Sequence, residues 1–567
     1  MSMADKKTKQ RLGSLLKRLV VHRFPLVIIL FCLIFTGIAT FLQPLIIQRI
    51  TDDGMATRNF SKIIWFALLL LVISGLEEIF MLIQSRLFVE LQNNIQLSLY
   101  GDSFRKLLHL KSDYFIDKNS AEIVNQITSD VSTMSTIADR AVLYFVSFLL
   151  SIIGGMIGLL MISWKMALIV MLVLPIKYLI TKIMSLRQEQ ITEKYIKLLT
   201  SFSAWFGDHI NGIREIKLWN LQQRKFDEFI KQQKDIVGAN KEMTMNDAGN
   251  TVFNGLIERT IKSILYIAGG FLLCKNELTI GGVIAFIAYS GQVIAPISAI
   301  LQIRMLLAQI SPAMNRLFDF LELDEEKDEG KRVIPFQTVE RIAMDSVTFG
   351  YDEGRQILEK VTFSAKRGEK VAIIGANGSG KTTIINLLLR FYNPQSGVIT
   401  INGVDAGEFK LGEYRDLFSV VSQDPYLFQD LIRNNIDLCH KSTEEEIQAA
   451  SRKSGFNSFI SNLPNGLNSL AGQDGANLSG GEKQKVAVAR AIIKDAPIVI
   501  FDEATSNFDV ESDMLLHDII MQEFEEKIII LITHNYKNLS GFNRIYQLTD
   551  GKLKEVELKN VFLLHDL

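Results

Sequence analysis

The chain has 567 residues, of which 48% are hydrophobic and 22% are charged, and its formal net charge is −1. This much apolar sequence is unusual for a purely soluble protein, and nucleic-acid-binding domains usually carry a basic excess, so we expect no nucleic-acid partner. The cysteines Cys32, Cys274 and Cys439 have neither the number nor the spacing of a disulfide framework or a structural zinc site.

Apolar residues gather in the first half of the chain, in segments of about 20 residues that are long enough to cross a bilayer. We predict six membrane-spanning helices, at Phe24–Leu42, Ile63–Ile83, Val142–Ile162, Ala167–Ile183, Val252–Leu273 and Ile280–Leu301. The alternative for each segment is a buried helix of a globular core, and the second and fifth segments are the most polar of the set.

Basic residues before the first span give the orientation. They are Lys6, Lys7, Lys9, Arg11, Lys17, Arg18 and Arg23. Because cytosolic flanks carry the excess of Lys and Arg, residues 1–22 are predicted to be a cytosolic N-terminus, and an even number of spans returns the chain to the cytosol. No small-residue cleavage site closes the first span, so we expect no signal peptide. We also expect no peptidase domain before Phe24.

Two polar insertions separate the spans, at about 85–140 and 185–250, and both have helical periodicity. They are too long to be simple membrane turns. A membrane domain is therefore predicted over residues 23–310, with these insertions as long intracellular loops.

Ionisable side chains inside the predicted spans are expensive and often functional, and six of them are candidates. They are Glu77, Glu78, Lys177, Glu258, Arg259 and Lys262. The alternative for Lys177 is a side chain that snorkels to water, and Glu258 with Lys262 at i,i+4 is expected to form a helix-stabilising pair. For these residues we favour the structural interpretation.

Residues 311–338 are acidic and polar and contain Pro335, so we predict a linker there. Its charges are interpreted as those of a solvated connector. A second domain is predicted over 339–567.

A nucleotide-binding motif opens this domain. Residues Gly375 to Thr382 match G-x-x-x-x-G-K-[ST] and follow the apolar run 371–374. Glycines at both ends allow a tight turn whose N–H groups point at phosphate, Lys381 supplies positive charge, and the Thr382 hydroxyl can ligate Mg²⁺. The residues expected around the phosphates are Gly375, Asn377, Gly378, Ser379, Gly380, Lys381, Thr382 and Thr383.

About 120 residues further on, a second apolar run, 498–501, ends in Asp502 and Glu503. A buried parallel strand presents such carboxylates at its C-terminal edge. Asp502 suits Mg²⁺ and Glu503 suits a water molecule.

Further motifs stand around these two, in a fixed order: Tyr351, Gln423, the run 478–482 (Leu-Ser-Gly-Gly-Glu), Asp509 and His534. Together they resemble ATP-binding cassette (ABC) proteins over the whole of 339–567. The resemblance implies binding and hydrolysis of ATP with Mg²⁺. The fold expected is a multidomain one: an all-α six-helix transmembrane bundle with long cytosolic extensions, followed by an α/β P-loop ATPase domain.

The resemblance also assigns roles to these residues. Tyr351 would stack on adenine, and Ser479, Gly480, Gly481 and Asp509 would complete the nucleotide site. Glu503 would polarise the attacking water, His534 would contact the γ-phosphate, and Gln423 would sense the γ-phosphate and bind Mg²⁺ together with Thr382 and Asp502. Glu482 stands where the family usually has Gln, which places an extra carboxylate at the start of the signature helix.

The signature helix would face the nucleotide held by a second cassette, and one chain has only one cassette. The resemblance to the exporter group therefore implies a half-transporter in a bilayer, in a bacterial inner membrane, with a homodimer as the first choice and a heterodimer as the alternative. Tyr114 to Lys118 and 212–219 resemble the positions of coupling helices.

The activity expected is ATP-driven export of an amphipathic or hydrophobic compound by alternating access of the dimer. Export of a modified or antimicrobial peptide is the alternative. An importer built on the exporter scaffold and a non-transporting channel regulator rank behind both.

Overall fold

The structure is a computed structural model that describes residues 7–557 except 8–9, 12, 15–16, 18–22, 116–117, 137–141, 334, 336–337, 352–353, 462, 504–509 and 535–538. The chain divides into two compact units at Glu325/Glu326.

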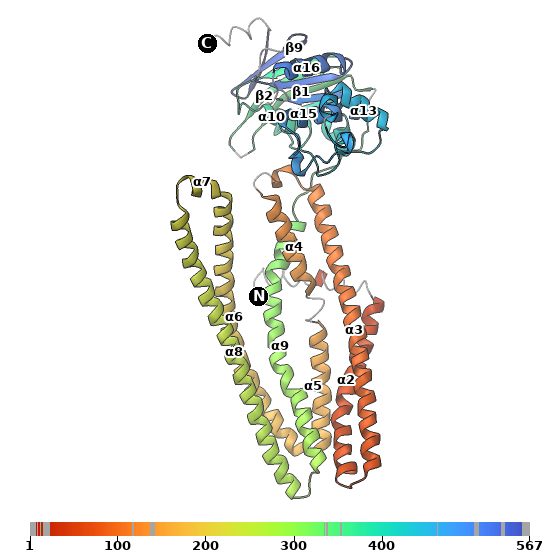
Figure 1. Cartoon of the computed structure of the whole chain (residues 1–567), viewed down its shortest axis with the longest axis vertical. Helices are drawn as coiled ribbons and strands as arrows, with labels where there is room; N and C mark the ends of the chain where they lie inside the picture. Colours follow the sequence, from red (N-terminus) through yellow and green to blue (C-terminus); the bar gives the residue numbers. More distant parts are fainter. Residues whose placement is uncertain are drawn as a thin grey trace. The chain divides into compact units, whose positions relative to one another are not determined.

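Long helices make up the first unit (Figure 1). They are α2 (Arg23–Arg49), α3 (Phe60–His109), α4 (Ser120–Thr136), α5 (Val142–Ile162), α6 (Trp164–Asn211), α7 (Ile213–Leu218), α8 (Gln222–Cys274) and α9 (Ile280–Leu321), with short turns at Ile50–Met55 and Ser112–Phe115. Each of the six predicted spans lies inside one of these helices. Ser163 and Thr279 cap α6 and α9, because each side chain accepts a hydrogen bond from a backbone N–H of the first turn.

By length and composition, four helices among the described residues could cross a membrane. They are Arg23–Met55, Phe60–His109, Trp164–Asn211 and Ile280–Ile297, and Val146–Ile162 is a shorter apolar helix. The fifth predicted span lies in α8, which carries Glu258, Arg259 and Lys262 and is not among the four.

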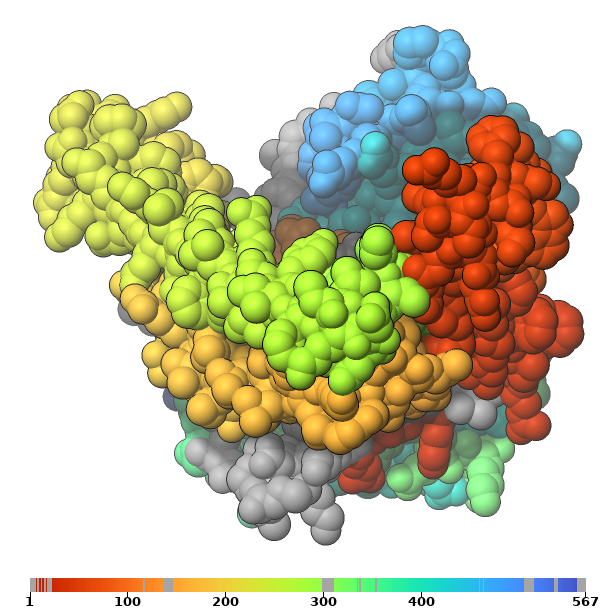
Figure 2. Space-filling model, turned by 90° about the horizontal axis from the view of Figure 1, so that it is seen from below, coloured from red at the N-terminus to blue at the C-terminus, as the bar shows by residue number. Residues whose placement is uncertain are grey.

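Helices α6 and α8 form an arm with α7 at its far end. Figures 1 and 2 show the yellow segment of this arm projecting away from the other helices of the unit. At its tip, Leu218 and Trp219 are 64% and 72% exposed. The second polar insertion thus continues α6 and α8, the helices that contain the fourth and fifth predicted spans. The first insertion continues α3 to His109 and then forms the separate helix α4.

The end of α9 differs from the prediction for 311–338, since the helix continues through Leu321. Met314, Leu317 and Phe320 recur at helical spacing and are buried in a core shared with α3 and α4. Charge alone was therefore a poor guide to where the linker begins.

Several of the acidic residues that follow form ion pairs, whereas the sequence predicted only a solvated connector. Arg11 pairs with Glu322 (2.8 Å), Lys106 with Glu325 (2.8 Å), and Arg415 with Glu326 (2.8 Å). The first two pairs lie within the first unit and the third within the second.

The second unit contains a six-stranded sheet of order β10-β9-β3-β8-β7-β6 and a four-stranded antiparallel sheet of order β2-β1-β4-β5. The strands are β1 (Arg341–Phe349), β2 (Leu358–Lys366), β3 (Lys370–Ile374), β4 (Ser396–Ile401), β5 (Val404–Asp405), β6 (Phe418–Val421), β7 (Ile498–Asp502), β8 (Ile528–Thr533), β9 (Arg544–Thr549) and β10 (Lys552–Val556). In the larger sheet, β9, β3, β8, β7 and β6 are parallel and only β10 is antiparallel.

The helices of this unit are α10 (Lys381–Leu388), α11 (Leu411–Asp416), α12 (Ile432–Ile436), α13 (Glu444–Lys453), α14 (Asn457–Ile460), α15 (Gly480–Lys494) and α16 (Val510–Gln522). Helices α10, α11, α15 and α16 pack on the strands of the larger sheet, whereas α12, α13 and α14 pack with α15 in a separate core. Alternate residues of β3 enter opposite cores, Val371 and Ile373 on one face and Ala372 and Ile374 on the other. A strand buried on both faces holds the loop that follows it rigidly.

Candidate active site

The phosphate-binding loop joins β3 to α10, and it curls around the side chain of Lys381. Lys381 Nζ donates to the carbonyl oxygens of Gly375 (2.9 Å) and Ala376 (3.1 Å). Gly378 and Gly380 have φ values of 78° and 106°, in the left-handed region that favours glycine. Such turns let successive N–H groups converge at the start of a helix, where anions bind.

The two predicted carboxylates stand at the C-terminal edge of β7, beside β8. Glu503 has φ of 46°, and its N–H donates to the Ile532 carbonyl at 2.8 Å, which ties the turn to the next strand. Its Oε1 lies 3.3 Å from Lys381 Nζ, and its Oε2 lies 3.4 Å from His534 Nδ1. Lys381 and His534, predicted from separate segments, therefore both contact the carboxylate of Glu503.

Asp502 lies next to this group. Burial and the neighbouring Glu503 charge raise the pKa of Asp502 from 3.8 to about 6, although Lys381 opposes the shift. A carboxylate held in such an environment gains most from a cation, which is the property expected of a Mg²⁺ ligand.

A cavity of about 560 Å³ lies against the phosphate-binding loop, lined by Gly375 to Ser379 together with 355–357 and 547–551. The Ser379 hydroxyl is buried and has no hydrogen-bond partner among the described residues. A polar atom of this kind fits a ligand rich in hydrogen-bonding oxygens, such as a phosphate.

Tyr351 lies near the first turn of α10. Its hydroxyl is 3.3 Å from Thr383 Oγ1 and accepts a hydrogen bond from Asn386 Nδ2 (3.2 Å). Tyr351 is 44% exposed, which leaves its ring accessible for stacking. Thr382, the neighbour of Lys381 in α10, is also exposed.

Gln423 follows β6 and is exposed, and a residue not anticipated from the sequence holds its backbone. Gln484, fully buried in α15, donates from Nε2 to the Gln423 carbonyl oxygen at 3.1 Å. The sequence does signal Gln484, as a polar residue on the apolar face of α15. Its partner, the Gln423 carbonyl, becomes evident only once the positions of β6 and α15 are known.

Ser479, Gly480 and Gly481 begin α15. The Ser479 hydroxyl accepts from the Glu482 N–H at 3.4 Å, and Glu482 Oε2 accepts from the Ser479 N–H at 2.7 Å, so the two residues form a capping box. No hydrogen bond between described residues joins this segment to the phosphate-binding loop. Asp509 lies outside the described residues.

The intramembrane residues divide into separate settings. Lys177 is buried and its Nζ donates to the Ile294 carbonyl at 2.9 Å. The sequence favoured a side chain that snorkels to water, and this buried position differs from that expectation. Glu258 and Lys262 form the expected pair at 3.2 Å. Glu77 borders a cavity between α2, α3, α5 and α9.

Two family models match this chain, one in each of its two units. Residues 26–297 match the family model of the ABC transporter transmembrane region, and residues 358–506 match that of the ABC transporter.

Similar proteins include one named ATP-dependent lipid A-core flippase from Alcanivorax borkumensis, 30% identical over 81% of this chain and 79% of its own length. One of the same name from Neisseria meningitidis serogroup B is 31% identical over 80% of this chain and 73% of its own. The uncharacterized ABC transporter ATP-binding protein YfiC from Bacillus subtilis is 27% identical over 97% and 91%.

Among solved structures, a bacterial Atm1-family ABC exporter with ATP bound has the same fold, with a TM-score of 0.80 and 23% identity over 97% of both chains. The predicted fold class is confirmed, as is an ATPase coupled to transport. The chain therefore belongs to the ABC transporters, as an integral, multi-pass ABC exporter half-transporter that needs a dimer partner.

Proposed function

We propose that this chain uses ATP hydrolysis to export an amphipathic or hydrophobic compound, drug-like or lipid-like. The observation that carries the proposal is the meeting of Lys381, Glu503 and His534 at the carboxyl edge of the larger sheet, in a chain whose other unit consists of membrane helices. Parallel sheets bind their ligands at this edge.

In this proposal Glu503 orients and polarises the attacking water, since its carboxylate already lies between a cation and an imidazole. Lys381 would exchange its carbonyl partners for phosphate oxygens, and His534 would contact the γ-phosphate. Thr382, Gln423 and Asp502 would hold Mg²⁺, which supplies charge neutralisation on the phosphates when bound. Tyr351 would stack on adenine.

We further propose a homodimer in the bacterial inner membrane, with the N-terminus and the ATPase unit in the cytosol. The phosphate-binding loop of one chain would meet Ser479, Gly480 and Gly481 of the other, and Asp509 would lie at the same junction. The lack of a hydrogen bond between these segments, among the described residues of one chain, supports this arrangement, and a heterodimer is the alternative.

The substrate class rests on two supports. The relatives at about 30% identity are named lipid A-core flippases, which favours a lipid-like compound. The cavity beside Glu77 mixes apolar and polar side chains, which suits an amphipathic one. A modified or antimicrobial peptide is the second candidate.

The test is the ATPase activity of the full chain, purified alone and reconstituted in lipid, with amphipathic drugs, lipids and peptides added in turn. We expect Glu503→Gln to lower turnover by about 10²–10⁴-fold, the contribution typical of a positioned acid–base group, while ATP still binds. One compound class should raise the wild-type rate.

An active wild-type chain would establish a competent homodimer, whereas activity that appears only with a second half-transporter would overturn the homodimer. Stimulation by peptides alone would replace the first substrate class with the second. If Glu503→Gln hydrolysed ATP as fast as the wild type, Glu503 would not be the residue that polarises the attacking water.

A further inference from the structure

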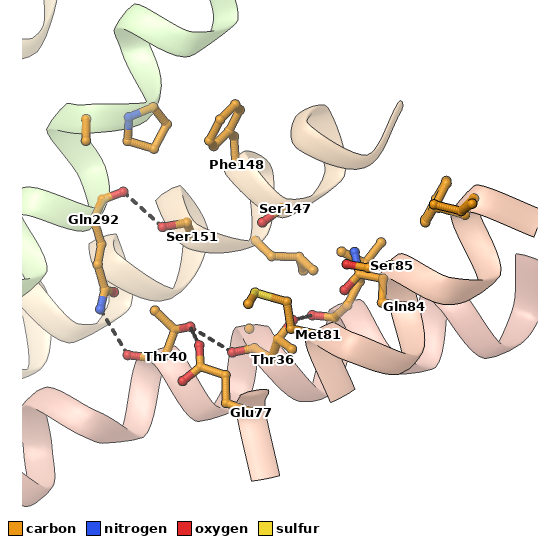
Figure 3. Close-up of a pocket in the computed structure, with 17 residues that line it drawn as sticks. Thr36, Thr40, Glu77, Met81, Gln84, Ser85, Ser147, Phe148, Ser151 and Gln292 are labelled. Atoms are coloured by element: carbon orange, nitrogen blue, oxygen red, sulfur yellow. Dashed lines mark hydrogen bonds between the residues drawn. The ribbon is translucent and has the colours of Figure 1, made fainter. Parts of the chain in front are cut away.

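The membrane unit contains a cavity of about 790 Å³ between α2, α3, α5 and α9, a volume within the range of sites for drug-sized ligands. Figure 3 shows Met81 and Phe148 among its apolar lining, and Gln84, Ser147 and Ser151 among its polar lining. The apolar and polar groups together suit a ligand that has both kinds of surface.

Glu77 is the only ionisable side chain among the described residues that line this cavity. Its Oε1 accepts from the Thr40 hydroxyl at 2.9 Å, and its Oε2 accepts from the Gln43 side-chain amide. The Thr40 carbonyl accepts in turn from Gln292 Nε2 at 2.9 Å. These contacts fix the position of the carboxylate, but every donor in them is neutral.

The charge of Glu77 has no counter-ion among the described residues. The carboxylate oxygens form no ion pair there, whereas Asp130 and Glu277 of the same unit are paired with Arg316 and Lys165. A lone carboxylate within a membrane span is costly unless a cation compensates it. A cation that arrives with the ligand would relieve this cost, and a like-charged head group would increase it.

We infer that this cavity binds an amphipathic organic cation, whose charge pairs with Glu77 while its apolar rings lie against Met81, Phe88 and Phe148. This inference rests on the proposed export of an amphipathic compound and specifies the charge of that compound. It separates this chain from a carrier of anionic amphiphiles.

Two ions of nearly equal size and shape but opposite charge provide the test, tetraphenylphosphonium and tetraphenylborate. Their binding to the full-length protein in lipid nanodiscs is compared with their binding to empty nanodiscs. We expect specific binding of the cation alone. Glu77→Gln should weaken that binding at least about tenfold, as the loss of a charge-assisted contact would, and Glu77→Asp should retain most of it.

Glu78→Gln is the matched control, because Glu78 is the next carboxylate of α3, is exposed and does not line the cavity. It should leave the preference for the cation intact. Glu77→Lys should reverse the preference toward tetraphenylborate, a gain that a misfolded protein would not produce. Cation binding unaffected by Glu77→Gln, or equal specific binding of both ions by the wild type, would overturn the inference.

Stimulation of the ATPase separates this inference from the proposed function. If neutral or anionic amphiphiles stimulate turnover and the cation neither binds nor stimulates, export stands and the cationic site is refuted. If the cation binds through Glu77 but no amphiphile of any charge stimulates an active ATPase, the site stands and the proposed substrate class fails.

Discussion

Glu482 places a negative charge at the N-terminal end of α15, where the capping box with Ser479 holds it. The helix dipole favours this carboxylate, but the phosphates of an approaching nucleotide would be repelled by it. In addition, the Ser479 hydroxyl and N–H are both engaged by Glu482. The residue that strengthens the helix start thus weakens the surface that a second nucleotide site would use.

We predict that Glu482→Gln lowers the KM for ATP by about two- to fivefold, because a charge near a helix end contributes about 0.3–1 kcal/mol. The assay is steady-state ATPase activity of the full chain at low and high salt. Glu446→Gln is the matched control, since Glu446 has the same place in the capping box of α13. A KM that stays the same, or rises, in Glu482→Gln would contradict the prediction.

Asp502 makes the nucleotide-free ATPase unit sensitive to pH. Its pKa is raised from 3.8 to about 6, so the folded chain binds this proton more tightly than the unfolded chain does. The contribution of Asp502 to the free energy of unfolding is therefore greatest below about pH 4. It falls as the pH rises from about 4 to about 6 and stays reduced above that, by up to about 3 kcal/mol.

Asp502→Asn should remove this penalty. We expect slower hydrogen exchange in β7 and β8 of the variant than of the wild type at pH 7.5 without nucleotide. At pH 5 the free-energy difference should be about half as large, after correction for intrinsic exchange rates. The variant should also lose the gain in protection that Mg²⁺ with ATP gives the wild type. Equal protection of the two proteins at pH 7.5 would show that Asp502 is not destabilised by its surroundings.

At the scale of elements, α5 and α9 approach closely because glycines of α5 face large side chains of α9. A Cβ at Gly158 would lie 2.6 Å from the ring of Tyr289, a residue that is fully buried and whose hydroxyl donates to the Phe41 carbonyl. A Cβ at Gly154 would be 3.7 Å from Phe41, an ordinary contact. A side chain larger than hydrogen therefore fits at Gly154 but not at Gly158.

Gly158→Ala should destabilise the membrane unit by about 1–3 kcal/mol, the usual cost of overpacking. Gly154→Ala should be neutral or slightly stabilising, because alanine favours helix and the space exists. Thermal denaturation of the two full-length variants in the same detergent compares them directly. Equal melting temperatures would mean that α9 can withdraw from α5 at little cost.

Much of the element order followed from the sequence. All six apolar segments lie in helices, because hydropathy detects side chains that face lipid, and the phosphate loop follows its strand because glycine and lysine have specific tasks there. The end of α9 did not follow, since Met314 and Leu317 are buried by distant segments that composition cannot reveal.

The sequence predicted which residues belong to the nucleotide site better than it predicted which of them contact one another. The meeting of Glu503 with Lys381 and His534 depends on β3, β8 and β7 lying side by side, and motif order alone does not specify that pairing. Gln484 was missed for the same reason, because its role becomes visible only when α15 lies against the segment after β6.

At the scale of the whole molecule, one chain supplies one phosphate loop and one signature segment, and no hydrogen bond between the residues that the structure describes joins the two. If each nucleotide site combines the loop of one chain with the signature of another, Lys381→Ala and Ser479→Arg should each inactivate a homodimer. A mixed dimer with one substitution on each chain would retain one intact site, made from the unsubstituted loop and the unsubstituted signature.

We predict that this mixed dimer, isolated through a different affinity tag on each chain, recovers up to about half of the wild-type ATPase activity. The matched control places Lys381→Ala and Ser479→Arg on the same chain, beside a wild-type partner. That dimer has no intact shared site and should be inactive. If each chain instead formed a complete site by itself, the two results would be exchanged, because the wild-type partner would remain active alone.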